Sequence, residues 1–322
     1  MHNDFTKSLA IERPIICGPM YPCSNPELVA AVSEAGGIGI VQPISLTFVH
    51  KYDFREGLKL IKSLTSKPFG FNALIEKSSK HYQDKMLQWV DIALEEGVRF
   101  FITSLGNPKW VVDRVSSQGG IVYHDVTERK WAEKGLEAGA RGLIAVNNRA
   151  GGHAGLKSKE LLFEELARYS VPLVCAGGIG SQKDFKEALS LGYQACQLGT
   201  RFIASDECKA SAAYKNAIVN SEAADIVLSE KITGVPVSVI MTPYIKQMGT
   251  KVGPIAKFLL KNKRTKHWIR TFYTLLSVFK FKKSLNDDKS EFWQAGKSVQ
   301  EIDEILPVAE IMKRLSVDKY NC

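Results

Sequence analysis

The stretch Ala176-Gly177-Gly178-Ile179-Gly180 follows the apolar run 172–176, and Gln197-Leu198-Gly199-Thr200-Arg201 follows the apolar run 195–198. Each glycine group therefore stands where a buried strand ends and the chain turns outward. Backbone N–H groups at such turns, together with the start of the next helix, form sites for anions such as phosphate. The two stretches predict adjacent strands whose ends share one phosphate site.

Working outward from these stretches, apolar runs alternate with helix-like segments along the first 200 residues. Their uniformly apolar character is typical of parallel strands covered by helices. Eight strand–helix units predict the α/β class and a TIM (β/α)8 barrel. A doubly wound open sheet is the alternative, but it would place its phosphate glycines after the first strand. The expected strands are 14–20, 38–41, 69–74, 100–103, 121–126, 143–146, 172–176 and 195–198.

The alternation stops near residue 205, which predicts two parts. Residues 1–205 are expected to form the barrel, and residues 206–322 a helical lid or substrate subdomain. Within the second part, 246–283 is rich in Lys and Arg and contains no Asp or Glu. Such a basic segment can meet an acidic partner, a membrane surface or nucleic acid. A closing helix over 307–315 is expected to return to the barrel.

The overall composition is that of a soluble globular enzyme, with 45% hydrophobic and 24% charged residues. The sequence lacks an apolar run long enough for a transmembrane helix and lacks a signal-peptide layout at its start. Its six cysteines show neither a C-x-x-C pair nor the spacing of metal ligands. This pattern predicts free thiols, no metal site and a cytoplasmic location.

Three polar side chains stand at predicted strand ends, which is where a barrel has its active site. His153 lies in Ala150-Gly151-Gly152-His153-Ala154-Gly155, and a histidine there can transfer protons near neutral pH. His124 ends the fifth strand and is a candidate substrate residue, with packing in the core as the alternative. Asn72 ends the third strand, and its amide suits the edge of a heterocycle, with turn formation as the alternative.

These residues carry a family resemblance. The chain resembles the nitronate monooxygenases, once called 2-nitropropane dioxygenases, and is similar to the related flavin-dependent enoyl-ACP reductases. The resemblance covers about residues 10–315 and is specific as a set. The matching pieces are Pro14 to Met20, Gly36-Gly37-Ile38-Gly39, Phe71-Asn72-Ala73-Leu74, Ala150 to Gly155, Ala176-Gly177-Gly178-Ile179, Gln197 to Phe202, Thr233-Gly234 and Phe292-Trp293-Gln294-Ala295-Gly296.

The resemblance implies a TIM-barrel flavoprotein that binds FMN. It implies that the FMN phosphate lies at Gly177, Gly178, Gly199 and Thr200. It matches His153 to the family's active-site histidine, which acts as a base or orients the substrate. The other cofactor-binding residues that it implies are Pro19, Met20, Asn72, Val146, Gly151, Gly152, Ala176, Gln197 and Leu198.

The implied reaction is the oxidation of an alkyl nitronate with O2 to a carbonyl compound and nitrite. Arg149 departs from the family pattern, because many relatives carry an acidic or small residue there, and it is a candidate substrate residue. A positive mouth suits a small anionic substrate, and equally an acidic acyl-carrier protein.

Two alternative functions stay open. One is an FMN- and NAD(P)H-dependent reductase of enoyl thioesters. The other is a membrane-associated binding role of the segment 246–283, for which a solvated lid helix is the favoured interpretation. Nucleic-acid binding is not expected, since no recognised module accompanies the charge. The sequence leaves open whether the chain forms a homodimer.

Overall fold

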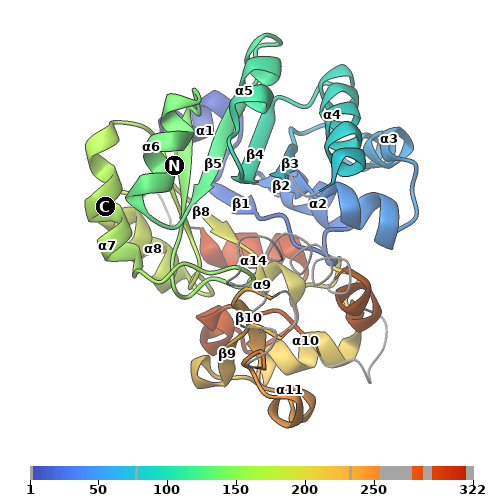
Figure 1. The fold of residues 1–322 in the computed structure, drawn as a ribbon, viewed down its shortest axis with the longest axis vertical. Helices are drawn as coiled ribbons and strands as arrows, with labels where there is room; N and C mark the ends of the chain where they lie inside the picture. The colour runs from blue at the N-terminus through green and yellow to red at the C-terminus, as the bar shows by residue number, and fades with distance from the viewer. Residues whose placement is uncertain (1–2, 77–78, 232–233, 254–277, 286–291, 317–322) are drawn as a thin grey trace.

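The computed structural model of the chain describes residues 3–76, 79–231, 234–253, 278–285 and 292–316. At its centre eight parallel strands pair in chain order and close into a barrel between β1 and β8 (Figure 1). The predicted α/β class and TIM (β/α)8 barrel are confirmed. The strands are β1 Ile15–Cys17, β2 Ile38–Val41, β3 Gly70–Ile75, β4 Phe100–Leu105, β5 Ile121–Val126, β6 Gly142–Val146, β7 Leu173–Ala176 and β8 Ala195–Leu198.

Two apolar layers explain why these segments are strands. One face of each strand points into the barrel, where Ile16, Tyr123 and Val174 belong to one buried cluster. The other face packs against the surrounding helices, as the alternation of side chains along a strand requires. The helices of the barrel are α2 Pro26–Glu34, α3 Phe54–Leu64, α4 Lys80–Glu95, α5 Lys109–Ser116, α6 Arg129–Glu137, α7 Lys159–Leu166, α8 Gln182–Leu191 and α9 Thr200–Ile203.

A short helix that the sequence analysis did not predict closes the amino-terminal end of the barrel. In α1, Asp4–Leu9, Phe5 is fully buried. Its ring lies 6.3 Å from that of Phe100 and 5.8 Å from that of Tyr123, centroid to centroid. Phe100 is the first residue of β4. Helix α1 therefore fills the end of the barrel opposite the expected active site.

Helix α8 begins and ends as its sequence predicts. Ser181 Oγ accepts from the Asp184 N–H, and the Asp184 carboxylate accepts from the Ser181 N–H. Gly192, with φ of +112°, ends the helix in the left-handed conformation. Asn25 stands at the N-cap position of α2 with Pro26 first in the helix, but its side chain makes no capping hydrogen bond, and its amide donates to Glu27 Oε2 and to the Glu207 carbonyl oxygen. Asn25 therefore ties the barrel to the segment beyond residue 205.

The chain beyond the barrel forms a small sheet and further helices, which gather below the barrel in Figure 1. Strands β9, Ile226–Ser229, and β10, Val237–Ile240, pair antiparallel. The closing helix α14, Val308–Leu315, packs against α2 and α8, near the predicted position. Helices α10, Ala212–Val219, and α11, Pro243–Met248, also belong to this part, and residues 278–285 are helical as well. Most of the basic segment, residues 254–277, lies outside the described residues.

Three features of the described residues concern the helices, the possible metal ligands and the cysteines. Every helix in the described ranges is too short or too polar to cross a bilayer. These ranges also hold no group of three His, Cys, Asp or Glu side chains arranged to bind a metal ion. The described cysteines are buried free thiols, namely Cys17, Cys23, Cys175, Cys196 and Cys208.

Candidate active site

The turn after β7 forms a backbone cradle that requires glycine. Gly177 and Gly178 have φ angles of +110° and +75°, which L side chains rarely adopt. A Cβ on Gly177 would lie only 2.5 Å from the Ala150 nitrogen and 2.6 Å from Asn147 Oδ1. The turn is therefore packed, backbone against backbone, on the loop that follows β6.

Asn147 holds these two turns together. Its Nδ2 donates to the Gly177 carbonyl oxygen at 2.9 Å, and its Oδ1 accepts from the Arg149 N–H at 2.8 Å. The side chain is buried, and hydrogen bonds shielded from water are electrostatically stronger. Asn147 thus fixes the cradle rather than lining it.

The turn after β8 completes the cradle with a hydroxyl group. Gly199 has a φ of −116°, and a Cβ there would lie at ordinary contact distance, 3.4 Å, from Met20 Sδ. Its lack of a side chain therefore leaves open space rather than relieving strain. Thr200 Oγ1 accepts from the Gly296 N–H at 2.9 Å. The Thr200 hydroxyl proton remains available to donate to an anion.

A distant part of the chain, residues 292–297, lies over this loop, and we call it the return segment. A Cβ on Gly296 would lie 2.6 Å from both the Arg149 carbonyl oxygen and the Gly151 nitrogen. The Lys297 N–H donates to the same Arg149 oxygen at 2.9 Å. The resemblance had marked Phe292 to Gly296, and the fold brings that piece to the site.

The glycine loop that carries His153 is held from two sides. On one side, the Ser238 N–H of β10 donates to the Gly152 carbonyl oxygen at 2.8 Å. On the other, a Cβ on Gly155 would lie 2.4 Å from the Val146 carbonyl oxygen. Sequence reasoning missed Ser238, because nothing in its local pattern indicates that β10 reaches this loop.

His153 is an exposed residue on the loop between β6 and α7. Protein atoms nevertheless surround the ring, and the resulting desolvation lowers the pKa of His153 below its ordinary value. The ring is therefore neutral at pH 7 and able to accept a proton. The ring has no hydrogen-bond partner among the described residues, so a bound ligand could form a hydrogen bond with it and fix its orientation.

Arg149 lies beside the cradle rather than apart from it. A Cβ on Gly178 would come within 2.8 Å of Arg149 Nε. The guanidinium Nη2 also donates to the Lys297 carbonyl oxygen at 3.3 Å. This geometry places a fixed positive charge next to the turn after β7, where it suits an anion bound in the cradle as well as an anionic substrate.

The inward faces of the strands supply the rest of the site. Val146 and Ala176 pack on the interior cluster of the barrel. Asn72 is buried, and its Nδ2 donates to the Ile102 carbonyl oxygen at 3.3 Å. Gln197 Oε1 is buried without a partner in the described part of the chain, which is rare for a buried acceptor. This oxygen is suited to receive a hydrogen bond from a ligand.

The predicted contacts beside β1 and β8 differ in character. Pro19 and Met20 are half-buried and follow β1 directly. The side chain of Leu198 instead packs in the cluster between strands and helices, and its carbonyl oxygen accepts from the Gly18 N–H at 2.9 Å. Leu198 can therefore reach a ligand only through its backbone.

His124 does not face the mouth, and this corrects its assignment as a candidate substrate residue. Its ring is 2% exposed and lies against Gly135 of α6, where a Cβ would come within 2.8 Å of His124 Cδ2. Its Nδ1 lies 2.9 Å from Thr103 Oγ1. Burial lowers the pKa of His124 to about 4, so the ring is a neutral part of the core.

The next residue, Asp125, takes the inward position instead. Tyr123 belongs to the interior cluster, and Asp125 lies two residues further along the same face of β5. Its Oδ1 is buried without a partner among the described residues. Counting the alternation of β5 from Tyr123 would have revealed this carboxyl group, which sequence reasoning missed.

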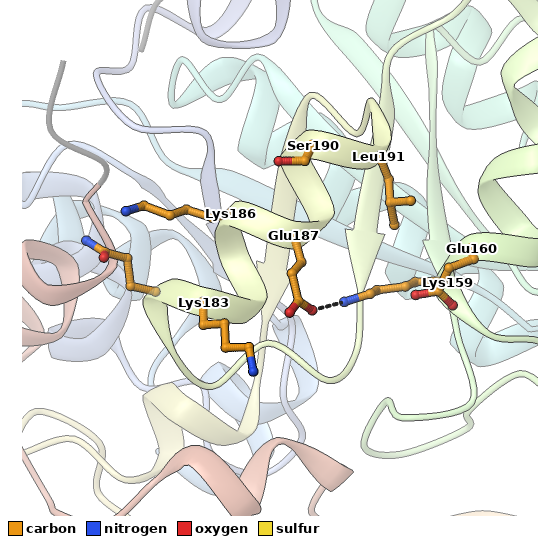
Figure 2. A pocket seen from close by; sticks show the side chains of 8 residues that line it. Lys159, Glu160, Lys183, Lys186, Glu187, Ser190 and Leu191 are labelled. Atoms are coloured by element: carbon orange, nitrogen blue, oxygen red, sulfur yellow. Dashed lines mark hydrogen bonds and ion pairs between the residues drawn. The ribbon is translucent and has the colours of Figure 1, made fainter. Parts of the chain in front are cut away.

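A groove on the outside of the barrel is unrelated to these residues. Figure 2 shows that it is lined by side chains of α7 and α8, including the ion pair of Lys159 with Glu187. These charged side chains belong to the helical outer layer, and none of the cradle or mouth residues lines the groove. The chemistry therefore has to be sought at the carboxyl ends of the strands.

Comparisons with known proteins relate the whole chain to one family. The model of the family described as "Nitronate monooxygenase" matches residues 3–318. A probable nitronate monooxygenase of Staphylococcus saprophyticus is 26% identical over 302 residues, covering 81% of this chain and 84% of the relative. A dehydrogenase of Rhodococcus jostii, named for a methyl-oxo-octahydroindene-carboxyl-CoA, is 26% identical over 249 residues, covering 77% and 68%.

Solved structures give the same fold. FabK from Thermotoga maritima is 29% identical, has a TM-score of 0.80, and the alignment covers 98% of this chain and 95% of that one. A nitroalkane oxidase from Streptomyces ansochromogenes has a TM-score of 0.74 at 22% identity, covering 97% and 96%. At that identity the second likeness concerns the fold alone.

Proposed function

The chain belongs to the nitronate monooxygenase family and is an oxidoreductase, and from this premise we propose that it uses FMN to oxidise alkyl nitronates with O2. The products are a carbonyl compound and nitrite. The observation that carries the proposal is the joining of two features in one loop. Its backbone packs on the glycine cradle at Gly177, and its tip presents His153 at the mouth.

The described residues fit FMN in two places. The cradle residues Gly177, Gly178 and Gly199 carry no side chain of their own, and the Thr200 hydroxyl and the Arg149 guanidinium suit a phosphate. The unpartnered Gln197 Oε1 on the inward face suits a donor on the ribityl chain or ring. When bound, FMN would supply the electron-transfer chemistry, and the protein supplies binding, orientation and electrostatics.

His153 is proposed to act as the base or to orient the substrate. Desolvation keeps its imidazole neutral at pH 7, which is the form that accepts a proton. The same ring can hold an anionic nitronate through an N–H group. The nearby charge of Arg149 would favour a small anionic substrate over a neutral one.

A titration of the purified protein tests this function. We expect the protein to hold FMN, and a nitronate added anaerobically to reduce the bound FMN. Admission of O2 should then restore the oxidised spectrum. A protein that refuses FMN would contradict the cofactor, and FMN that ignores nitronates would contradict the substrate.

An FMN- and NAD(P)H-dependent reductase of enoyl thioesters is the second candidate. The likeness to FabK, at 29% identity over nearly the whole chain, favours it. The relative named for a carboxyl-CoA substrate is a further argument for a thioester. Anaerobic NADH or NADPH separates the two candidates, because rapid reduction by nicotinamide without reduction by nitronates is expected only of the reductase.

A further inference from the structure

Asp125 is an acidic side chain that the proposed function has not used. It lies one residue before the end of β5, on the face that Ile121 and Tyr123 turn toward the barrel interior. In the parallel pairing of β5 with β6 it stands beside Ile144, another interior residue. The carboxyl group is therefore directed into the mouth of the barrel, at the end where the cradle and His153 lie.

Among the described residues no charged group is paired with this carboxyl group. The flanking strands β4 and β6 contain no ionisable residue. On β5 itself, His124 points outward and Tyr123 is neutral. On the loop after β6 the ionisable groups are Arg149, His153 and Lys157, and Lys157 pairs with Glu165. The solvent-facing charges of the packed helices α5 and α6 lie on the outer side of β5, namely Lys109, Asp113, Arg114, Arg129, Lys130, Glu133, Lys134 and Glu137.

Burial alone raises the pKa of Asp125, to about 7. Oδ1 accepts no hydrogen bond in the described part of the chain, so such a bond does not stabilise the ionised carboxylate. A ligand that covers the mouth removes further water from it. Covering a carboxylate costs more free energy than covering a neutral carboxylic acid, so such a ligand favours the protonated form.

We propose that Asp125 is a cofactor-binding residue that holds a proton, and that its neutral carboxyl group donates a hydrogen bond to an acceptor on the flavin ring. This inference rests on the proposed use of FMN. A protonated carboxyl group has one O–H donor, which complements the acceptor that Gln197 Oε1 offers elsewhere on the inward face. FMN binding and proton uptake at Asp125 are then coupled.

The coupling fixes the direction of the pH effect. Above the pKa of the free protein, binding FMN requires Asp125 to take up a proton first. The dissociation constant should therefore rise with pH, by at most about tenfold per pH unit, which is the limit for one coupled proton. The FMN phosphate, whose second pKa is about 6, titrates in the same region, so it has to be controlled.

Fluorescence titrations with FMN and with riboflavin between pH 6 and pH 9 test this coupling. Riboflavin lacks the phosphate, so a pH effect common to both ligands belongs to the protein. In the wild type we expect both dissociation constants to rise about tenfold or more over this range. Asp125→Asn, which keeps a donor and cannot ionise, should bind with nearly constant affinity. The control Asp113→Asn removes an exposed carboxylate of α5 and should behave as the wild type.

Several outcomes would overturn the inference without touching the proposed function. One is a wild type that binds FMN with the same affinity at pH 6 and pH 9. Another is an Asp125→Asn variant that retains the pH dependence. A wild type that does not bind FMN at any pH contradicts the proposed function itself, and the inference falls with it.

Calorimetry on the wild type alone covers the case in which the variant does not fold. Binding of FMN at pH 8, measured in two buffers with different ionisation enthalpies, gives the number of protons taken up. We expect about one proton, because Asp125 is largely ionised in the free protein at this pH and neutral in the complex. The absence of proton uptake would contradict the inference.

Discussion

Gly178 and Gly97 share a backbone conformation but differ in their surroundings. Both have positive φ angles, +75° and +88°. A Cβ on Gly97 would meet nothing within 4 Å, whereas one on Gly178 would meet Arg149 Nε at 2.8 Å. Gly97 ends a helix, whereas Gly178 forms part of the cradle. This pair separates the cost of a strained backbone from the loss of a binding site.

We expect Gly97→Ala to lower the free energy of unfolding by about 1–2 kcal/mol, the usual cost of a left-handed L residue. Gly178→Ala should lower it by more, because its Cβ would also meet Arg149. Only Gly178→Ala should weaken FMN binding, by about tenfold, as its turn relaxes. Denaturant unfolding and fluorescence titration measure the two effects. Equal FMN affinity in both variants would remove the turn after β7 from the phosphate site.

His153 is predicted to matter for turnover and not for cofactor binding. His153→Ala should retain FMN and lose about 10²- to 10⁴-fold in turnover, the usual contribution of a general base. His81→Ala, at an exposed position on α4, serves as the matched control. Steady-state oxygen consumption with a nitronate measures the loss. Full turnover in His153→Ala would exclude the residue from the mechanism.

The pH dependence of turnover follows from the same desolvation. Because the pKa of His153 is lowered, the neutral base persists below pH 6.5, and turnover should fall only when the pH drops through the lowered pKa. A pH profile of nitronate oxidation in wild type checks this acid limb. An acid limb at or above pH 6.5 would contradict the assignment of this ring as a desolvated base.

At the scale of elements, the return segment has the largest effect on the site. Gly296 lies against the backbone of the loop that carries Gly151. The same segment is held from the other side, since the Tyr214 hydroxyl donates to the Gln294 carbonyl oxygen at 2.5 Å and the Ile240 N–H to the Trp293 carbonyl oxygen at 2.9 Å. Helix α10 and strand β10 thus press this segment onto the barrel mouth.

Gly296→Ala should therefore disturb both stability and cofactor binding. The added Cβ would meet backbone atoms at 2.6 Å, and backbone cannot swing aside as a flexible side chain can. We expect a loss of about 1–3 kcal/mol in the free energy of unfolding, as for an overpacked core, and weaker FMN binding. Gly253→Ala, where a Cβ would meet nothing within 4 Å, is the control for thermal unfolding and FMN titration. Wild-type FMN affinity in Gly296→Ala would mean that the return segment does not shape the cradle.

At the scale of the molecule, the sequence predicted the elements whose bounds depend on neighbouring residues alone. The bounds of β5 and β8 and the caps of α8 follow from apolar runs and capping residues and agree with the structure. Helix α1 was missed because its six residues are marginal alone and are held by Phe5 inside the barrel. The inward direction of Asp125 depends on which face of β5 meets the core. The position of the return segment depends on a contact between residues more than 140 positions apart.

At the scale of the whole molecule, His124 should contribute stability that is lost in acid. Its pKa is about 4 when folded and about 6.5 when unfolded, so between these values the unfolded chain binds a proton that the folded chain does not. Stability is therefore present above pH 6.5 and is lost as the pH falls toward 4. We expect His124 to account for a loss of about 2 kcal/mol between pH 7 and pH 4.5. The raised pKa of Asp125 acts in the opposite direction and by a similar amount, so the contribution of His124 shows only when wild type is compared with a His124 variant.

Replacing the ring isolates its contribution. His124→Asn keeps a polar group near Thr103 and cannot titrate in this range. Between pH 7 and pH 4.5 its free energy of unfolding should therefore increase relative to that of the wild type, by about 2 kcal/mol. Urea unfolding at both pH values, compared between wild type and variant, gives the difference. Equal pH dependence in the two proteins would show that His124 makes no such contribution.

The hydrogen bond from Ser238 to Gly152 makes the glycine loop belong to two parts of the chain at once. The loop follows strand β6 of the barrel, yet it is held by a hydrogen bond from strand β10, which lies more than 80 residues further along the chain. A gene fragment ending near residue 205 would encode all eight barrel strands without that support. Recombination between relatives should therefore preserve the histidine loop and the second half of the chain as one inherited block, even though a boundary near residue 205 looks like the natural place to exchange them.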